Sequence, residues 1–217
     1  MSRIPLDLLG QSGIAYFGRT TASVSHELKN ALAIIKENAG LIEDYLLMAE
    51  KGMPIAPEKF KMITGRIGVQ TQRADKLIKD MNRFAHSSDN HCTSTDLNEL
   101  AGLFVALSHR EAAMRQVELA LSSSKSPAMV TTSPFLLLTL MGRCFTFCLG
   151  AATPKSRLLI ESKQSENSKE ICIGPFSNVS ALTGDTFPGE QETELLNTLK
   201  ASFMIDESCG TVIIGLA

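Results

Sequence analysis

Residues 17–32 of the 217-residue chain read FGRTTASVSHELKNAL, and they lie within a longer segment with a regular spacing of apolar residues. From about residue 12 to residue 51, apolar positions recur in steps of three and four, which is the spacing of one face of an α-helix. We call these positions the apolar stripe: Ile14, Phe17, Thr21, Val24, Leu28, Leu32, Ile35, Ala39, Ile42, Leu46 and Ala49, with polar Thr21 as an interruption. The sequence therefore predicts a first helix of roughly 40 residues.

A second long helix is predicted to follow after a short turn. Gly52 ends the first helix, Pro54 and Pro57 flank the turn, and Pro57 suits the first position of a helix. The apolar positions of this second helix are Phe60, Ile63, Ile67, Gln70, Ala74, Leu77, Met81 and Phe84. One such hairpin buries its apolar faces poorly, whereas two hairpins bury them in a four-helix bundle, so we expect a homodimer through residues 12–86. Spacing alone favours a coiled-coil hairpin without any chemistry.

Composition and charge exclude several classes of protein. Apolar residues make up 44% of the chain and the formal net charge is -2, which excludes a disordered chain and gives no support for nucleic-acid binding. The cysteines are odd in number (five) and lack the spacing of a disulfide framework. No signal peptide is visible at the start of the sequence. We therefore expect a cytoplasmic protein.

The second part of the chain predicts a small domain of mixed helices and strands over residues 92–217, after a helical domain over residues 1–91. Thr95 or Asp96 suits the cap of a helix that runs to about Arg115. The apolar run after Pro134 is near membrane-spanning length, but Arg143 within it favours a core helix over a membrane span. Further strands are predicted at 116–121, 157–162, 170–174 and 210–216, and a helix at 190–203. The overall class is α+β.

The chemical signal of the first helix is the run from Ser25 to Asn30, SHELKN. If Val24 and Leu28 face the bundle, His26 points into solvent, and Asn30 shares its face because it lies four residues further on. An exposed imidazole is mostly neutral at pH 7, and a neutral imidazole is a nucleophile for phosphoryl groups.

The residues around His26 suit such a reaction. Glu27 is adjacent and can hold the other ring N–H and take up its proton. Ala22 and Ala33, about one to two turns away, leave room for the phosphorylated loop of a partner. A zinc motif His-Glu-x-x-His is excluded because Asn30 replaces its second histidine. The alternative is an ordinary surface histidine beside an ordinary glutamate.

These residues resemble a known family. The stretch from Phe17 to Leu32, with its His-Glu-x-x-Asn pattern, resembles the phospho-acceptor box of sensor histidine kinases, and the hairpin resembles their dimerisation and histidine-phosphotransfer domain. The resemblance implies that His26 is phosphorylated, that Glu27 is the activating acid or base, and that Asn30 takes part in phosphoryl chemistry and, in some members, in phosphatase activity. The family often has Pro after this Asn, where this chain has Ala31.

The order of elements after residue 92 resembles the ATP-binding domain of the same family, but its nucleotide-binding motifs do not match. Two asparagines of that domain align with Cys144 and Cys148, and thiols are poor ligands for Mg²⁺. An Asp-x-Gly-x-Gly motif should follow the strand at 170–174, where the sequence continues GPFSN from Gly174 to Asn178. We therefore expect this chain to bind neither ATP nor a metal ion.

The hypothesis that unites these features is a dimeric histidine phosphotransferase, built on a histidine-kinase scaffold as in bacterial phosphorelays, with a degenerate ATPase-like α/β sandwich. His26 would exchange a phosphoryl group with the aspartates of response-regulator receiver domains, which would supply the Mg²⁺. Arg19 and Lys29 would attract the acidic receiver site, or would simply be a solvated charged face. The alternatives are a divergent histidine kinase or response-regulator phosphatase that still binds ATP, and a non-enzymatic scaffold.

Overall fold

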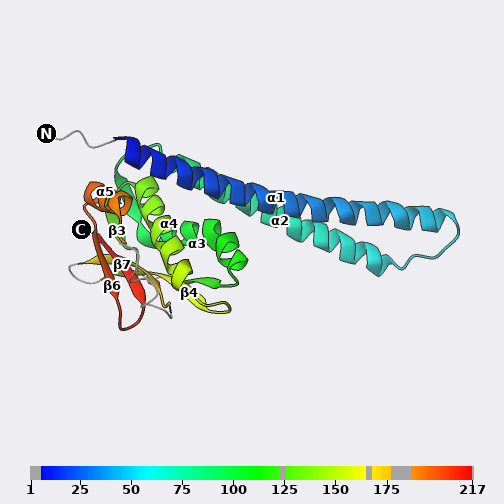
Figure 1. Ribbon diagram of the computed structural model, residues 1–217. Coiled ribbons are helices and arrows are strands. Elements are labelled where there is room, and N and C mark those ends of the chain that lie inside the picture. The colour runs from blue at the N-terminus through cyan, green and yellow to red at the C-terminus, as the bar shows by residue number, and fades with distance from the viewer. Residues whose placement is uncertain (1–5, 123–125, 165–167, 177–186, 217) are drawn as a thin grey trace. The chain divides into compact units, whose positions relative to one another are not determined.

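A computed structural model describes residues 6–122, 126–164, 168–176 and 187–216, which form an α+β protein (Figure 1). The elements, in chain order, are α1 (Leu6–Glu50), α2 (Pro57–His86), β1 (Thr93–Asp96), α3 (Leu97–Met114), β2 (Glu118–Ser122), β3 (Met129–Thr132), α4 (Pro134–Ala151), β4 (Arg157–Gln164), β5 (Lys169–Gly174), α5 (Glu190–Leu199), β6 (Ser202–Asp206) and β7 (Thr211–Leu216). The predicted order, a long helical hairpin followed by a small α/β domain, is confirmed.

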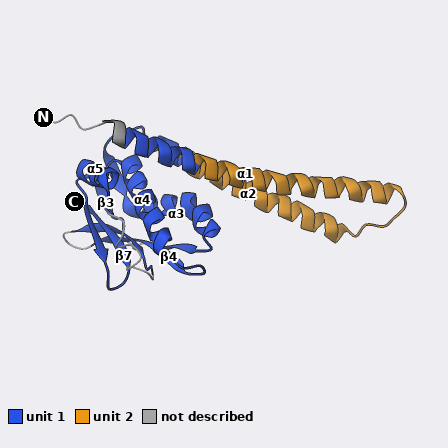
Figure 2. Cartoon of the chain, viewed as in Figure 1, with its two compact units in different colours: residues 1–20, 83–217 blue, residues 21–82 orange. Residues whose placement is uncertain are grey.

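The chain forms two compact units (Figure 2). The hairpin unit comprises residues 21–82, and the α/β unit comprises the described parts of residues 1–20 and 83–217. These boundaries differ from the division at residue 91 that the sequence predicts, because the first turns of α1 and the last turn of α2 pack within the α/β unit.

In the hairpin unit, the residues of α1 that face α2 form a row of their own. Its buried members are Val24, Ala31 and Asn38, and between them lie Glu27 and Ile34, half-buried. We call these five residues the inward row. On α2 the predicted apolar positions do face α1, with Ile63 buried and Phe60 edge-on to Tyr45 at a ring-centroid distance of 5.9 Å.

The apolar stripe predicted for α1 lies beside the inward row. Of the stripe residues within the hairpin unit, only Val24 is buried, whereas Leu32 is 59% exposed and Leu46 is 53% exposed. Both rows follow steps of three and four, so the spacing in the sequence does not distinguish the row that faces α2 from its neighbour. Much of the apolar stripe is therefore uncovered in the single chain.

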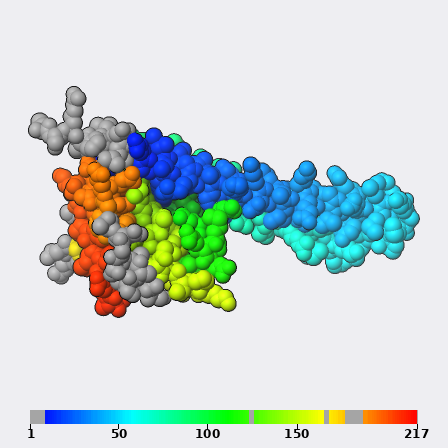
Figure 3. Space-filling view, in the orientation of Figure 1, coloured from blue at the N-terminus to red at the C-terminus, as the bar shows by residue number. Residues whose placement is uncertain are grey.

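The α/β unit is built on a five-stranded sheet of order β2-β4-β5-β7-β6, in which β2 and β4 are parallel and the other neighbours antiparallel. Strands β1 and β3 form a separate antiparallel pair. Helices α3, α4 and α5 lie side by side on the face shown in Figure 3. Side chains from α4 and the sheet are fully buried in the core, among them Leu138, Phe145, Ile160, Ile171 and Ile214.

Helix α4 holds the apolar run that is near membrane-spanning length. By length and composition it is the one helix in the described part of the chain that is apolar enough to cross a membrane, and 67% of that window is buried inside the protein. Arg143 within it forms an ion pair with Glu192 of α5, whose carboxylate also accepts a hydrogen bond from the Gly189 N–H at 2.9 Å. This burial favours the interpretation of α4 as a core helix.

The ends of the long helices pack against α4 in the α/β unit. Tyr16 of α1 is buried against Gly142 of α4, where any larger side chain would collide with the tyrosine ring. Phe84 of α2 is fully buried, with ring centroids 5.4 Å from Phe17 and 5.9 Å from Phe135. Phe17 and Phe84 were predicted to lie in the hairpin bundle, but they pack within the α/β unit instead.

The helix ends confirm one prediction from the sequence and correct another. The Asp96 side chain caps α3 by accepting a hydrogen bond from the Asn98 N–H at 3.0 Å. The helix predicted to run from residue 190 to residue 203 ends at Leu199, because Lys200 adopts a left-handed conformation with φ of 53°. Phe203 therefore lies in β6, a strand that the sequence did not predict.

Candidate functional site

His26 lies on α1 in the hairpin unit, and its side chain is exposed as expected. Asn30, one turn further along, is also exposed and shares the same face of the helix. Among the described residues, none forms a hydrogen bond or an ion pair with the imidazole of His26. Both ring nitrogens are therefore accessible to a partner molecule.

Glu27 has a different environment from its neighbour. Its carboxylate belongs to the inward row, and Oε2 accepts a hydrogen bond from Nη2 of Arg73 on α2 at 2.9 Å. The Glu27 side chain is 13% exposed and that of Arg73 is 51% exposed. The structure thus brings Glu27 to Arg73 rather than to His26. Sequence reasoning missed Arg73, because a contact between two helices depends on their register, which one sequence does not reveal.

The other residues predicted to meet a partner are exposed on α1. Ala22, Lys29 and Ala33 lie in the hairpin unit, within two turns of His26. Ala22 and Ala33 lie four residues before and seven residues after His26, so they lie on roughly its side of the helix. Arg19 is also exposed, but it belongs to the part of α1 that packs in the α/β unit.

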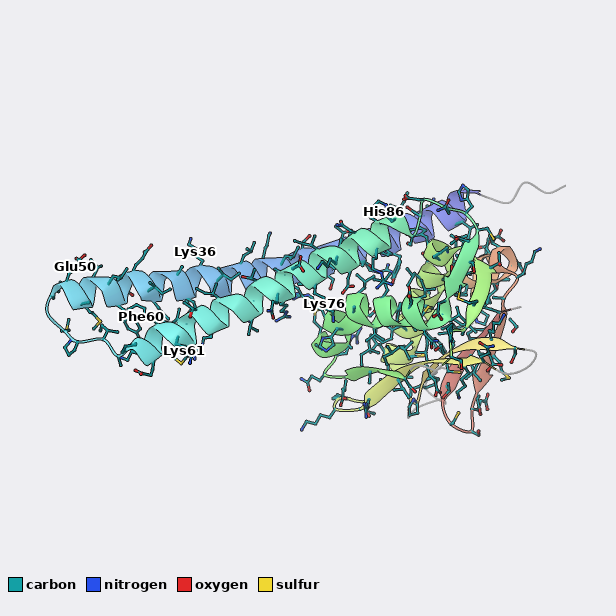
Figure 4. The ribbon with its side chains drawn as sticks, turned by 180° about the vertical axis from the view of Figure 1, so that it is seen from behind. Lys36, Glu50, Phe60, Lys61, Lys76 and His86 are labelled. Atoms are coloured by element: carbon teal, nitrogen blue, oxygen red, sulfur yellow. The ribbon has the colours of Figure 1, made fainter. Side chains whose placement is uncertain are left out.

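A groove of about 590 Å³ runs between α1 and α2 in the hairpin unit, and its lining includes Glu37 and Asn38 of α1 and Arg66, Val69 and Gln70 of α2. Glu37 lines it three helical turns after His26, so the groove opens on the side of the hairpin that bears His26. Two buried oxygens at the groove, Asn38 Oδ1 and Gln70 Oε1, accept no hydrogen bond from any described residue. Exposed Val69 adds apolar surface to this region. Figure 4 shows the side chains of both helices.

The two cysteines that align with the family's asparagines are core residues of α4. Cys144 and Cys148 are fully buried, and the Cys148 thiol contacts the carbonyl oxygen of Ile173 on β5 at 3.9 Å. Burial raises the pKa of both thiols well above its ordinary value, so both stay protonated at pH 7. The thiolate is the form that binds metal ions, and burial disfavours this form at both cysteines. Within the described ranges, no three His, Cys, Asp or Glu side chains are grouped so that they could hold a metal ion.

Phenylalanines occupy the region that follows β5 and the adjacent face of α4. Phe147 of α4 stacks on Phe187 with ring centroids 4.1 Å apart and is edge-on to Phe176 at 6.5 Å, and Phe187 is edge-on to Phe203 at 5.5 Å. We call these four residues the phenylalanine cluster. The backbone N–H of Phe176 donates a hydrogen bond to the Gly210 carbonyl oxygen at 2.8 Å. Of the quoted GPFSN run, Ser177 and Asn178 lie outside the described residues.

The exposed His26, followed by Glu27 and then Asn30 on a long helical hairpin, is the arrangement that the sequence resemblance leads us to expect. Residues 18–90 match the protein family described as "His Kinase A (phospho-acceptor) domain". The matched segment contains His26, Glu27, Asn30 and Arg73. No curated protein matches the chain.

Several solved structures are similar to this chain. The histidine kinase AdeS of Acinetobacter baumannii has 13% sequence identity and a TM-score of 0.44, with 88% of this chain and 95% of that chain covered. A bacterial phosphotransferase has 12% identity and a TM-score of 0.45, with 99% and 98% covered. The histidine kinase ThkA, in complex with the response regulator TrrA, has 16% identity and a TM-score of 0.47, with 94% and 62% covered.

The family match and the geometry of His26 agree with each other. Together they support a relation to sensor histidine kinases and a role in two-component signal transduction, with phosphotransfer at a histidine as the chemistry.

Proposed function

We propose that this chain is a cytoplasmic, dimeric histidine phosphotransferase of a phosphorelay. His26 accepts a phosphoryl group from the receiver aspartate of one response regulator and donates it to the aspartate of another. The observation that best supports a receiver domain, rather than ATP, as the phosphoryl donor is the contrast between His26 and the region that corresponds to a nucleotide site. The histidine is exposed with accessible ring nitrogens, whereas phenylalanines and protonated thiols occupy the positions where the family resemblance would place nucleotide-binding residues.

In the proposed reaction, one imidazole nitrogen of His26 attacks the phosphorus atom of the receiver's aspartyl phosphate. The bond between phosphorus and the aspartate oxygen breaks, a nitrogen–phosphorus bond forms, and the aspartate leaves as a carboxylate. Glu27 takes up the proton of the other ring nitrogen, and Asn30 donates a hydrogen bond to a phosphoryl oxygen. The receiver supplies the Mg²⁺, so this chain contributes a positioned nucleophile and no metal ion of its own.

The receiver domain is proposed to dock on the side of the hairpin that bears His26. The groove on that side is lined by three kinds of group: apolar surface at Val69, the two unpaired buried oxygens, and the charged side chains of Glu37 and Arg66. A partner helix that presents apolar side chains and hydrogen-bond donors would satisfy this groove. The small side chains of Ala22 and Ala33 leave room for the phosphorylated loop, and Lys29 and Arg19 attract its acidic surroundings.

The homodimer is proposed to form through the apolar stripe of α1. Leu32 and Leu46 are more than half exposed in the single chain, and the half-buried Leu28, Ile35 and Ile42 continue the same row. Burial of such a row against a second hairpin is favourable by about 25 cal/mol for each Å² of apolar surface. The apolar stripe lies on one side of the inward row and the groove opens on its other side. A dimer through the stripe therefore leaves the groove free for a receiver domain.

The proposal is tested by offering the purified chain two phosphoryl donors separately, radiolabelled ATP with Mg²⁺ and a radiolabelled phosphorylated receiver domain. We expect acid-labile, alkali-stable label on the wild-type chain from the receiver, none from ATP, and none on a His26→Gln variant from either donor. Label from ATP would establish the alternative of a divergent histidine kinase. Loss of label from the receiver as inorganic phosphate, faster with the chain than without it, would establish a phosphatase. Equal signalling by His26→Gln in cells would establish a scaffold.

A further inference from the structure

The ion pair between Glu27 and Arg73 is unusual for its place in the hairpin unit. Glu27 occupies the inward row, between Val24 and Ala31, where apolar side chains bury surface against α2. Its carboxylate is largely buried and meets the Arg73 guanidinium at 2.9 Å. By contrast, the pair of Lys79 and Asp75 lies within one helix and is well exposed on both sides.

Stability does not account for this pair. A partly exposed ion pair contributes about 0–1 kcal/mol, and a well-packed apolar side chain at an inward-facing position stabilises a helix pair at least as well. The position of Glu27 next to the exposed His26 points to a role in the reaction. Oε2 is held by Arg73, whereas none of the described residues donates a hydrogen bond to Oε1, which leaves this second oxygen free to accept the imidazole proton.

We propose that Arg73 is a positioning residue for phosphoryl transfer at His26, an inference that rests on the proposed function. Arg73 on α2 holds one carboxylate oxygen of Glu27 on α1 and so limits where the other oxygen can lie. Oε1 of the held Glu27 is then the acceptor for the proton that leaves the neighbouring His26 ring when the nitrogen–phosphorus bond forms. Without Arg73, the Glu27 side chain samples several rotamers, and fewer of them present an oxygen to the ring.

The test uses the full-length chain and two phosphoryl donors, a phosphorylated receiver domain and phosphoramidate. Phosphoramidate is a small donor that needs no docking: its phosphorus–nitrogen bond breaks, ammonia leaves, and the phosphoryl group bonds to the imidazole. The variants are Arg73→Gln, Arg73→Lys, Glu27→Gln and the double variant Arg73→Gln/Glu27→Gln. Lys76→Gln is the matched control, because Lys76 is an exposed cation about one turn further along α2 (Figure 4).

We expect Arg73→Gln to slow labelling of His26 by roughly tenfold with both donors, which is less than the roughly 10²-fold that loss of a general acid or base costs. Arg73→Lys restores most of the rate, because an ammonium group also pairs with the carboxylate. In the Glu27→Gln background, Arg73→Gln has no further effect, and the Kd for the receiver stays unchanged. Lys76→Gln leaves the phosphoramidate rate unchanged.

Two results would overturn the role of Arg73: equal effects of Arg73→Gln and Lys76→Gln, or a loss from Arg73→Gln that persists undiminished in the Glu27→Gln background. Circular dichroism and thermal unfolding of each variant separate a folding defect from a loss of rate. If Arg73→Gln does not fold, Arg73→Lys still tests the role of the cation. If the wild-type chain takes label from phosphoramidate on His26 but none from phosphorylated receivers, the proposed function fails. The phosphoramidate comparison still decides the role of Arg73.

Discussion

The hairpin unit and the α/β unit distribute burial and chemistry in opposite ways. The hairpin unit leaves much of its apolar stripe uncovered and presents His26 and Asn30 to solvent. The α/β unit has a fully buried core around α4 and the sheet, and buried thiols and the phenylalanine cluster lie where the family resemblance would place nucleotide chemistry. The difference shows that the candidate reactive residue lies in the unit that leaves more of its apolar surface uncovered, and not in the unit with the well-packed core.

Removal of a large side chain from each unit tests the contrast in burial. Phe145 is fully buried and edge-on to Phe104 at 5.6 Å, so Phe145→Ala should lower the free energy of unfolding of the α/β unit by about 3–5 kcal/mol. Ile78 is an exposed side chain of the hairpin unit, and Ile78→Ala should change stability by less than about 0.5 kcal/mol. Urea unfolding followed by circular dichroism measures both. Similar costs for the two variants would contradict the contrast in burial.

A second prediction concerns the uncovered stripe. Leu32→Glu places a charge in the proposed dimer interface, and we expect the Kd of the dimer to rise about 10- to 100-fold, equivalent to about 1.4–2.8 kcal/mol. Val69→Glu is the matched control, because Val69 is 61% exposed but lies near the groove on the other side of the hairpin. Sedimentation equilibrium over a range of concentrations measures both variants. An unchanged dimer in Leu32→Glu would place the interface elsewhere.

A third and smaller effect concerns the buried thiols of the α/β unit. Burial raises the pKa of the Cys172 thiol to about 11 and raises the pKa of the Cys144 and Cys148 thiols as well. The unfolded chain therefore loses these protons at a lower pH than the folded chain. The protonated thiols therefore stabilise the folded chain fully below about pH 8.5, the ordinary pKa of a thiol, and this contribution is lost as the pH rises toward the folded pKa. The free energy of unfolding falls by at most about 1.4 kcal/mol for each pH unit and each thiol.

This effect is measured by urea unfolding between pH 7.5 and pH 10.5 under reducing conditions, with the cysteine at residue 148 replaced (Cys148→Ala) in a parallel series. The slope above the ordinary thiol pKa should be shallower in Cys148→Ala. Identical slopes would show that the Cys148 thiol ionises equally well in the folded and unfolded chains.

Much of the fold follows from local signals in the sequence. Local signals predict the helices: the starts near Pro57, Asp96 and Pro134, and the long periodic runs. Both capping and periodicity depend on neighbours in the chain. Strand β6 was missed because the left-handed conformation of Lys200 that ends α5 has no glycine to mark it. The apolar stripe was predicted correctly as a row, but its place relative to α2 depends on how the two helices are rotated.

The candidate site shows the same limit. The exposure of His26 and Asn30 follows from helix periodicity, since both lie away from the inward row. The pairing of Glu27 with Arg73 and the contacts of the phenylalanine cluster join residues far apart in the chain. Such contacts depend on tertiary packing, which no spacing within one sequence encodes.

The most direct test of the central claim follows a phosphoryl group through the chain. A labelled phosphorylated receiver domain and an unlabelled second receiver are mixed with a small amount of this protein, without ATP, and the label on each species is followed over time. We predict that label reaches the second receiver only when the chain is present and only through His26, with a transient labelled form of the chain. Transfer at the same rate with His26→Gln, or release of all label as inorganic phosphate, would contradict the account.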